Sequence, residues 1–169
     1  KGIETLKRIS MDEGMYRPHY IWGRLFSEAA RYADAEEELK KAVKLDPDVI
    51  EAREELGRVL MKLGKYDEAV SIYNEILHLD PDNFSSWYNL GAAHARAKRW
   101  KDAAACYSEA VRIRPDSHKS YYNMAMALEE AGDRKSSIEA YKKSIELNPG
   151  FAGAYNNLGI LLTIDGMRE

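Results

Sequence analysis

Apolar and small residues recur along the chain with a period of 34 residues. When residues 16–49, 50–83, 84–117 and 118–151 are aligned without gaps, apolar or small residues occupy positions 7 and 8, and again positions 20, 24, 27 and 28, in every stretch. Positions 4 and 11, on the same helix face as 7 and 8, hold large residues. Each set has the spacing of one face of an α-helix. The pattern therefore predicts two amphipathic helices in every stretch of 34 residues.

Proline and glycine mark the turns between the predicted helices. Position 32 of every stretch is a proline, at Pro47, Pro81, Pro115 and Pro149. Because proline cannot continue a helix, each of them predicts the end of a second helix. Within the segments 63–69 and 131–137, Gly64 and Gly132 are expected to end the first helix of their stretch.

Small residues at two positions predict how the paired helices meet. Position 8 holds Gly23, Gly57, Gly91 and Ala125, and position 20 holds Ala35, Ala69, Ala103 and Ser137. Short side chains let two helix backbones approach closely, while larger residues at positions 4, 7, 11 and 24 fill the space around the contact. The two helices of each stretch are therefore expected to form a tightly packed hairpin.

Several short segments resemble the tetratricopeptide repeat, a helix-turn-helix unit of the same period. They are WYNLG (87–91), YNNLG (155–159), GKYDEA (64–69) and LDPDN (79–83). The resemblance covers essentially the whole chain and rests on several positions in each of four repeats. It implies an all-α fold, a right-handed superhelical solenoid in which first helices line a concave groove and second helices lie outside.

The same register extends beyond the four full repeats at 16–49, 50–83, 84–117 and 118–151. Residues 1–15 resemble the second helix of a truncated repeat, and residues 152–169 resemble the first helix of another. We therefore expect one array, cut from a longer one. Apolar residues at such an end would lack a covering helix, which predicts end-to-end self-association.

Composition excludes several classes of function. The chain has 169 residues, of which 45% are hydrophobic and 31% charged, with a net charge of −3 that offers no broad basic surface to nucleic acid. No apolar run approaches the ~18 residues of a membrane-spanning helix, so membrane insertion is not expected. The single cysteine, Cys106, cannot form an internal disulfide and fits a reducing compartment such as the cytoplasm without fixing the location.

No pattern of residues predicts catalysis, a metal site or a cofactor. The four histidines occupy different repeat positions, so they are not expected to converge on a metal ion. Cys106 has no suitably spaced histidine and is expected to be a packed residue of a second helix. The adjacent acids Glu129 and Glu130 are expected on a solvated helix face. The chain is therefore predicted not to be an enzyme.

Binding is expected on the concave face, which the resemblance assigns to the first helices. Positions 2, 5, 6, 9, 12 and 13 of a first helix form one stripe at helical spacing. In the N-terminal half this stripe is charged, whereas in the C-terminal half it becomes mostly neutral and amphipathic. The predicted partner-binding residues all lie in that second half: Tyr88, Asn89, Ala92, Arg96, Lys119, Tyr122, Asn123, Met126, Asn156 and Asn157.

Position 6 forms a row of asparagines, Asn89, Asn123 and Asn157. Asparagine is unfavourable inside a helix, and a carboxamide can hydrogen-bond both the N–H and the C=O of a peptide backbone. The row therefore either recognises an extended partner peptide or reflects the residue that is common at this position of the repeat family. Tyr88 and Tyr122, beside the row, are expected either to form side-chain pockets or to pack on the neighbouring first helix.

The resemblance leaves three functions open. The first is a non-enzymatic scaffold that binds a protein or peptide partner in its concave groove. The second is the substrate-recruiting arm of a larger enzyme such as an O-linked glycosyltransferase, and the third is a self-assembling scaffold. Some arrays of this family grip a C-terminal carboxylate, but only Asn89 and Lys119 match that clamp, so it is not expected here.

Overall fold

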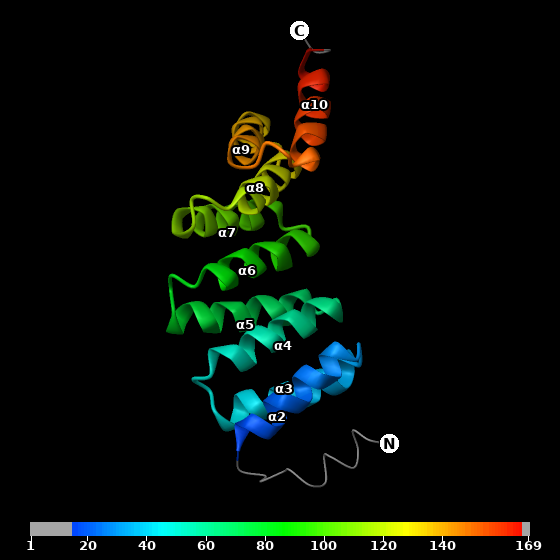
Figure 1. Ribbon diagram of the computed structural model, residues 1–169, viewed down its shortest axis with the longest axis vertical. Helices are drawn as coiled ribbons and strands as arrows, with labels where there is room; N and C mark the ends of the chain where they lie inside the picture. The colour runs from blue at the N-terminus through cyan, green and yellow to red at the C-terminus, as the bar shows by residue number, and fades with distance from the viewer. Residues whose placement is uncertain (1–14, 167–169) are drawn as a thin grey trace. The chain divides into compact units, whose positions relative to one another are not determined.

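The computed structural model describes the backbone of residues 15–166 and the side chains of residues 15–163. This described part contains nine α-helices and no strand (Figure 1). The helices are α2 (Tyr16–Glu28), α3 (Tyr32–Leu45), α4 (Ile50–Lys62), α5 (Tyr66–Leu79), α6 (Phe84–Arg96), α7 (Trp100–Ile113), α8 (His118–Glu130), α9 (Arg134–Leu147) and α10 (Ala152–Gly166). The predicted all-α class is confirmed. The helix expected within residues 1–15 lies almost wholly outside the described residues.

The helices follow the 34-residue period closely. α2, α4, α6 and α8 begin at the first residue of the four aligned stretches, and α3, α5, α7 and α9 begin sixteen residues later in each case. The described residues divide into two compact units, one on each side of the boundary between Pro81 and Asp82. Within the first unit, α3 packs against both α2 and α4, and α4 packs against α5. Within the second unit, α6, α7, α8, α9 and α10 each pack against the next helix in order.

Glycine at position 8 allows the close helix contact within a repeat. A Cβ atom at Gly57 would lie 2.7 Å from Cζ of Tyr73, and one at Gly91 would lie 2.9 Å from Cε1 of Tyr107. Both tyrosines stand at position 24 of the following helix and are buried. The first helix therefore presents bare backbone to a large ring on the second, as the pattern of small and large residues predicts.

The turn between the two helices of a repeat has one backbone conformation in all four repeats. Its position 15 takes a positive φ, at Ala30 (56°), Gly64 (74°), Lys98 (58°) and Gly132 (87°). The residue after it then donates its backbone N–H to a carbonyl of the last helical turn, for example Arg31 to Phe26 at 2.8 Å and Arg99 to His94 at 2.9 Å. Glycine reaches this conformation easily, whereas Ala30 and Lys98 are held in it despite their side chains.

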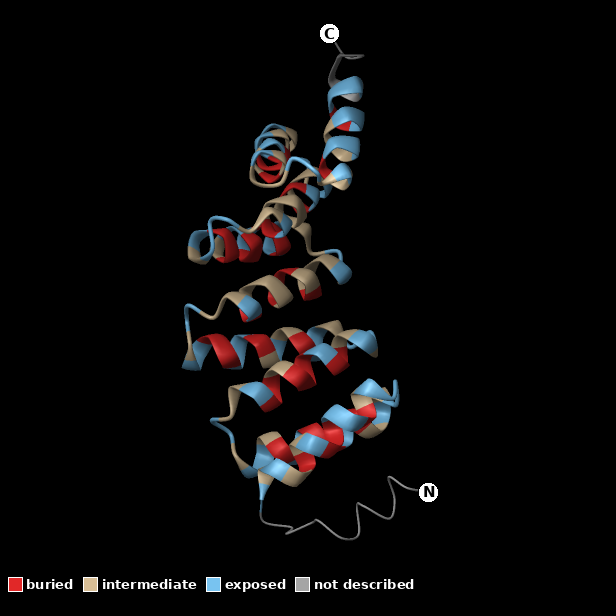
Figure 2. Cartoon of the chain, in the orientation of Figure 1, coloured by how far each residue is buried: buried red, intermediate tan, exposed pale blue. Residues whose placement is uncertain are grey.

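The core lies along the helix faces that meet within each unit (Figure 2). Ala69 in the first unit and Ala103 in the second are fully buried, as expected for position 20. In the second unit one cluster forms around Ala103, Tyr107 and Ala127. Another forms around Tyr141 and Leu161. None of the helices within the described range combines the length and hydropathy needed to cross a bilayer.

Candidate functional site

All ten predicted partner-binding residues lie on α6, α8 and α10, the first helices of the second unit. The structure leaves four of them exposed, namely Arg96, Lys119, Met126 and Asn156. The other six are half-buried, namely Tyr88, Asn89, Ala92, Tyr122, Asn123 and Asn157. Their spacing along each helix follows from the helical period, which brings positions 5, 6 and 9 to one side of the helix.

Two of the asparagines bond to the tyrosine of the preceding repeat. The Nδ2 atom of Asn123 on α8 donates to the Tyr88 hydroxyl on α6 at 2.8 Å. The same pair recurs one repeat later, where Nδ2 of Asn157 on α10 donates to the Tyr122 hydroxyl on α8 at 3.2 Å. These contacts form a side-chain ladder, which we call the Asn–Tyr ladder, that links α6, α8 and α10.

The ladder determines which atoms of the carboxamides remain for a ligand. Asn157 also donates to the Tyr141 hydroxyl at 3.2 Å, so both of its N–H groups have partners and only Oδ1 can still bond a ligand. Asn123 retains Oδ1 and one N–H group. Asn89 instead donates to the Ser85 hydroxyl of its own helix at 3.4 Å, so it stands outside the ladder.

The rings of the ladder tyrosines pack against other aromatic side chains. Tyr88 makes an edge contact with Tyr107, with ring centroids 5.7 Å apart. Tyr122 makes an edge contact with Phe151, with centroids 4.9 Å apart, and a tilted contact with Tyr141 at 5.8 Å. These ring contacts are made with α7, α9 and Phe151, the residue before α10, and they fix the ring positions from which the two hydroxyls meet the asparagines.

A small hollow adjoins the ladder between α8 and α10. Its volume is about 180 Å³, and it is lined by Met126, Glu129, Glu130, Tyr141, Asn157 and Ile160. Met126 and Ile160 give it apolar walls, while two carboxylates stand at one side. The Tyr141 hydroxyl donates to Glu129 Oε2 at 2.9 Å, and burial raises the pKa of that hydroxyl, so it remains a neutral donor near neutral pH.

The sequence pattern predicted Met126 and Asn157 as binding residues but did not predict the acidic side of this hollow. Glu129 is half-buried and bonded to Tyr141, so it is not simply part of a solvated helix face. The sequence did indicate an acidic part of the binding surface, because Glu129 and Glu130 occupy positions 12 and 13 of the stripe that was expected to face a ligand. Tyr141, from a second helix, could not be assigned to the site by the period alone.

Comparison with known protein families agrees with the repeat architecture. Models of the tetratricopeptide repeat match residues 20–84, 54–118, 118–151 and 140–167. The chain belongs to the tetratricopeptide repeat superfamily. The resemblance read from the sequence motifs is thus confirmed, and the Asn–Tyr ladder is a contact between first helices of successive tetratricopeptide repeats. No curated protein matches the chain.

Solved tetratricopeptide repeat structures are similar over nearly the whole chain. A crystal structure of MamA protein is 25% identical with a TM-score of 0.86, covering 94% of this chain and 86% of that one. MamA from Desulfovibrio magneticus RS-1 is 22% identical with a TM-score of 0.85, covering 93% and 88%. YrrB is 21% identical with a TM-score of 0.79, covering 100% and 86%. The repeats and these similarities support a protein-interaction scaffold.

Cys106, His19 and His94 each have packing or hydrogen-bonding partners within their repeats. Cys106 is 6% exposed, and burial raises the pKa of its thiol to about 12, as suits a packed residue. His19 Nδ1 lies 2.7 Å from Glu38 Oε2 inside the first unit. His94 Nδ1 accepts a hydrogen bond from Arg99 Nε at 3.0 Å. Across the described residues, no three metal-binding side chains come together.

Proposed function

We propose that this chain is a non-enzymatic scaffold that binds an extended peptide segment of a partner protein along α6, α8 and α10. The observation that carries the proposal is the Asn–Tyr ladder. It holds a row of polar groups in fixed positions on one side of three successive first helices. Groups that are already ordered lose little conformational freedom when a ligand arrives.

The ladder provides both the hydrogen-bond acceptors and the hydrogen-bond donors that a peptide backbone needs. The Oδ1 atoms of Asn123 and Asn157 can accept hydrogen bonds from peptide N–H groups. The hydroxyls of Tyr88 and Tyr122 accept from the asparagines and can donate their own protons to peptide carbonyls. Such contacts recognise an extended backbone and leave the partner's side chains to be selected elsewhere.

The adjoining hollow would select one of those side chains. Its two carboxylates, Glu129 and Glu130, favour a cation, and Met126 and Ile160 suit an aliphatic stem. Arginine and lysine combine both features. The proposed ligand is therefore an extended peptide with a basic residue. YrrB, which shares the fold, is described as a tetratricopeptide repeat protein with an unusual peptide-binding site.

The test is a peptide selection followed by titration. Random short peptides displayed on phage are selected on the intact chain, and those enriched in arginine or lysine are titrated by fluorescence anisotropy. We expect Asn123→Ala with Asn157→Ala to weaken their binding about tenfold or more, because ligand amides lose their partners. Glu129→Gln with Glu130→Gln should weaken peptides with a basic residue more than their alanine-substituted versions.

The control for the asparagine pair is Asn74→Ala, on an exposed part of α5 in the first unit. It makes the same chemical change in a helix but leaves the ladder intact, so peptide affinity should not change. If the ladder variant binds every selected peptide as tightly as the parent while remaining folded, peptide recognition by the ladder is wrong.

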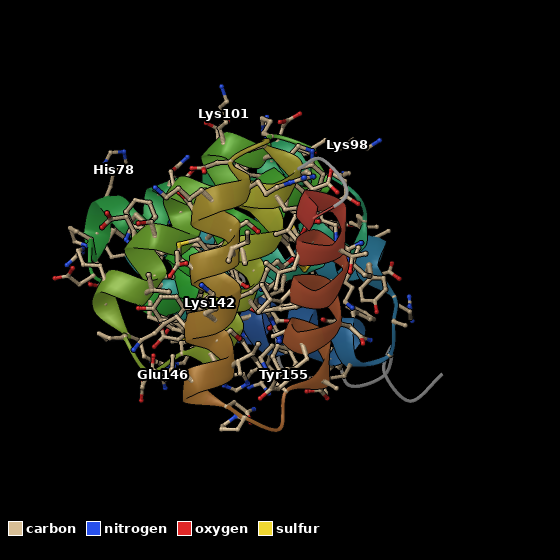
Figure 3. The ribbon with its side chains drawn as sticks, turned by 90° about the horizontal axis from the view of Figure 1, so that it is seen from above. His78, Lys98, Lys101, Lys142, Glu146 and Tyr155 are labelled. Atoms are coloured by element: carbon tan, nitrogen blue, oxygen red, sulfur yellow. The ribbon has the colours of Figure 1, made fainter. Side chains whose placement is uncertain are left out.

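A second candidate function, self-association, is favoured by the open face of α10. A Cβ atom at Gly159 would meet nothing within 4 Å, whereas the equivalent glycines of α4 and α6 lie under tyrosine rings. Tyr155, Ile160 and Leu162 on this helix are 50%, 59% and 47% exposed (Figure 3 labels Tyr155). An apolar helix surface of this kind is suited to a helix from a second copy of the chain.

Analytical ultracentrifugation over a range of concentrations tests this second candidate. Association of the parent that is abolished by Leu162→Glu would support it. Leu79→Glu on α5 is the matched control, since Leu79 is similarly exposed in the first unit. A parent that stays monomeric at the highest concentration rules self-association out.

A further inference from the structure

A larger groove lies on a different side of the second unit from the ladder. It runs between α7 and α9 across α8 and has a volume of about 750 Å³. Its floor includes Met124 and Leu128. Met124 is two residues from both Tyr122 and Met126, which corresponds to about 200° around a helix, so the groove and the ladder use different faces of α8. We call this feature the outer groove.

Short side chains form part of the walls of the outer groove, beside longer charged side chains of α9. Ala104, Ala105 and Ser108 line it from α7, and Ser136 and Ala140 line it from α9. Ala105, Ser108 and Ser136 are exposed. The groove is therefore an open surface with an apolar floor.

The first unit has the same backbone register, but its side chains bridge the corresponding place. Lys40 on α3 bonds Glu68 on α5 with an Nζ–Oε2 distance of 3.0 Å. Lys65, at the start of α5, bonds Glu36 on α3 with an Nζ–Oε1 distance of 2.7 Å. These side chains connect α3 to α5 over α4, just where α7 and α9 flank α8 in the second unit.

At the equivalent positions of the second unit, two repeats later in the sequence, the residues cannot form the same ion pairs. Lys40 and Glu68 correspond to Ser108 and Ser136, and Glu36 and Lys65 correspond to Ala104 and Asp133. A third bridge, from Arg53 Nε to Glu75 Oε2 at 3.1 Å, corresponds to Tyr121 and Lys143. The outer groove therefore lies where the second unit has short side chains, or side chains that do not form these ion pairs, at positions equivalent to the bridges of the first unit.

The charges around the outer groove favour an acidic ligand. Its lining contains two lysines, Lys135 and Lys143, and a single acid, Glu139, although the chain as a whole carries a net charge of −3. Glu139 Oε1 accepts from Lys142 Nζ at 2.9 Å (Figure 3 labels Lys142), and Lys143 Nζ donates to Glu146 Oε1 at 2.8 Å. With both pairs counted, the three lysines Lys135, Lys142 and Lys143 exceed the two acids by one. A local excess of lysine beside an apolar floor complements a carboxylate next to a large apolar side chain.

We propose that the outer groove is a second docking site, for a partner peptide that presents a bulky apolar side chain next to an aspartate or glutamate. The apolar side chain lies on Met124 and Leu128, and the acid approaches Lys135 and Lys143. The site is independent of the ladder, which is proposed to take peptides with a basic residue. The two surfaces therefore differ in the charge of the ligand they select.

The experiment rebuilds the bridge of the first unit across the groove. Ser108→Lys with Ser136→Glu copies the Lys40–Glu68 pair into the same register. Random short peptides displayed on phage are selected on the intact parent chain and titrated individually. We expect a class containing Trp, Phe or Leu beside an acid, whose affinity falls about tenfold or more in the bridged variant. Asn123→Ala with Asn157→Ala should leave this class unaffected.

Charge reversal tests the lysines separately. Lys135→Glu with Lys143→Glu should also weaken the acidic class about tenfold. Lys98→Glu with Lys101→Glu makes the same change in net charge at exposed residues outside the lining, both labelled in Figure 3, and should have little effect. Equal losses in the two charge variants would show a nonspecific effect and overturn the assignment of the lysines.

Circular dichroism verifies that each variant is folded. If the bridged variant does not fold, Ala105→Trp fills the groove from an exposed position and takes its place. The docking proposal is overturned if the selection yields no peptide whose affinity falls in a folded variant with a bridged or filled groove. It is also overturned if the sensitive peptides carry basic residues and no acidic ones.

Discussion

The Asn123 carboxamide and the Tyr88 hydroxyl are 35 residues apart in sequence and 2.8 Å apart in space. This bond makes Asn123 part of the contact between α6 and α8 as well as part of a binding surface. The same holds for Asn157 and Tyr122. A residue that is unfavourable within a helix is therefore compensated by a partner on the neighbouring repeat.

Removing the acceptor of this bond should reduce stability. In Tyr88→Phe the ring packing against Tyr107 remains, but the Asn123 N–H group loses its partner, which should cost about 0.5–1.5 kcal/mol in the free energy of unfolding. Urea denaturation measures the change. Tyr155→Phe is the control, because Tyr155 is half exposed on α10, and it should be neutral. Equal stability of Tyr88→Phe and the parent would mean that the bond contributes nothing.

Alanine substitution at two glycines of the same repeat position should change the free energy of unfolding in opposite directions. In Gly91→Ala the new methyl group meets the Tyr107 ring, so overpacking of ~1–3 kcal/mol should exceed the gain in helix propensity. In Gly159→Ala the methyl group meets nothing, so only the gain of up to ~1 kcal/mol remains. Thermal unfolding compares the two variants. A destabilising Gly159→Ala would contradict the open face of α10.

Glycine should stabilise the turns that now contain Ala30 or Lys98. Both residues adopt a positive φ, which is unfavourable for a residue with a Cβ atom. Ala30→Gly and Lys98→Gly should therefore each raise the free energy of unfolding by about 0.5–1 kcal/mol. The neighbouring residue Ala97 has a φ of −82°, so Ala97→Gly should be destabilising. Chemical denaturation of the three variants distinguishes this explanation from a general benefit of glycine in the turn.

Cys106 should report on opening of the second unit. Because burial raises the pKa of its thiol to about 12, the folded chain carries almost no thiolate at mildly alkaline pH, and reaction with a disulfide reagent should be slow. Between the unfolded pKa of about 8.5 and the folded value, the unfolded chain binds fewer protons. This group therefore lowers stability as pH rises through that range. Ser136→Cys in a Cys106→Ala background is exposed and should react rapidly. Rapid labelling of native Cys106 would contradict its burial.

The repeat architecture was readable from the sequence because it depends on residues whose geometry has few alternatives. Proline at position 32 ends a helix in any environment, and a small residue at position 8 is needed wherever a large one stands at position 24. The turn conformation at Ala30 and Lys98 could not be read in this way. Neither residue prefers a positive φ, so the packing of the two flanking helices imposes it.

The candidate site was predicted less completely than the fold. The helical period correctly brought Asn123 and Asn157 to one side of their helices, but it could not reveal that tyrosines of the preceding repeat accept their hydrogen bonds. That information depends on side-chain conformation between helices. The outer groove was also missed, because it is defined by what Ser108 and Ser136 lack in comparison with Lys40 and Glu68.

The ion-pair bridges of the first unit and the short side chains of the second unit occupy equivalent positions of the 34-residue repeat. Helix spacing in both units is set by buried residues such as Ala69 and Ala103, which the surface exchange does not touch. The binding specificity of this chain can therefore change through substitution of a few exposed side chains while the fold stays the same. In protein design, the buried residues that set the helix spacing could be kept while the exposed residues that close or open the groove are transferred from one repeat to another.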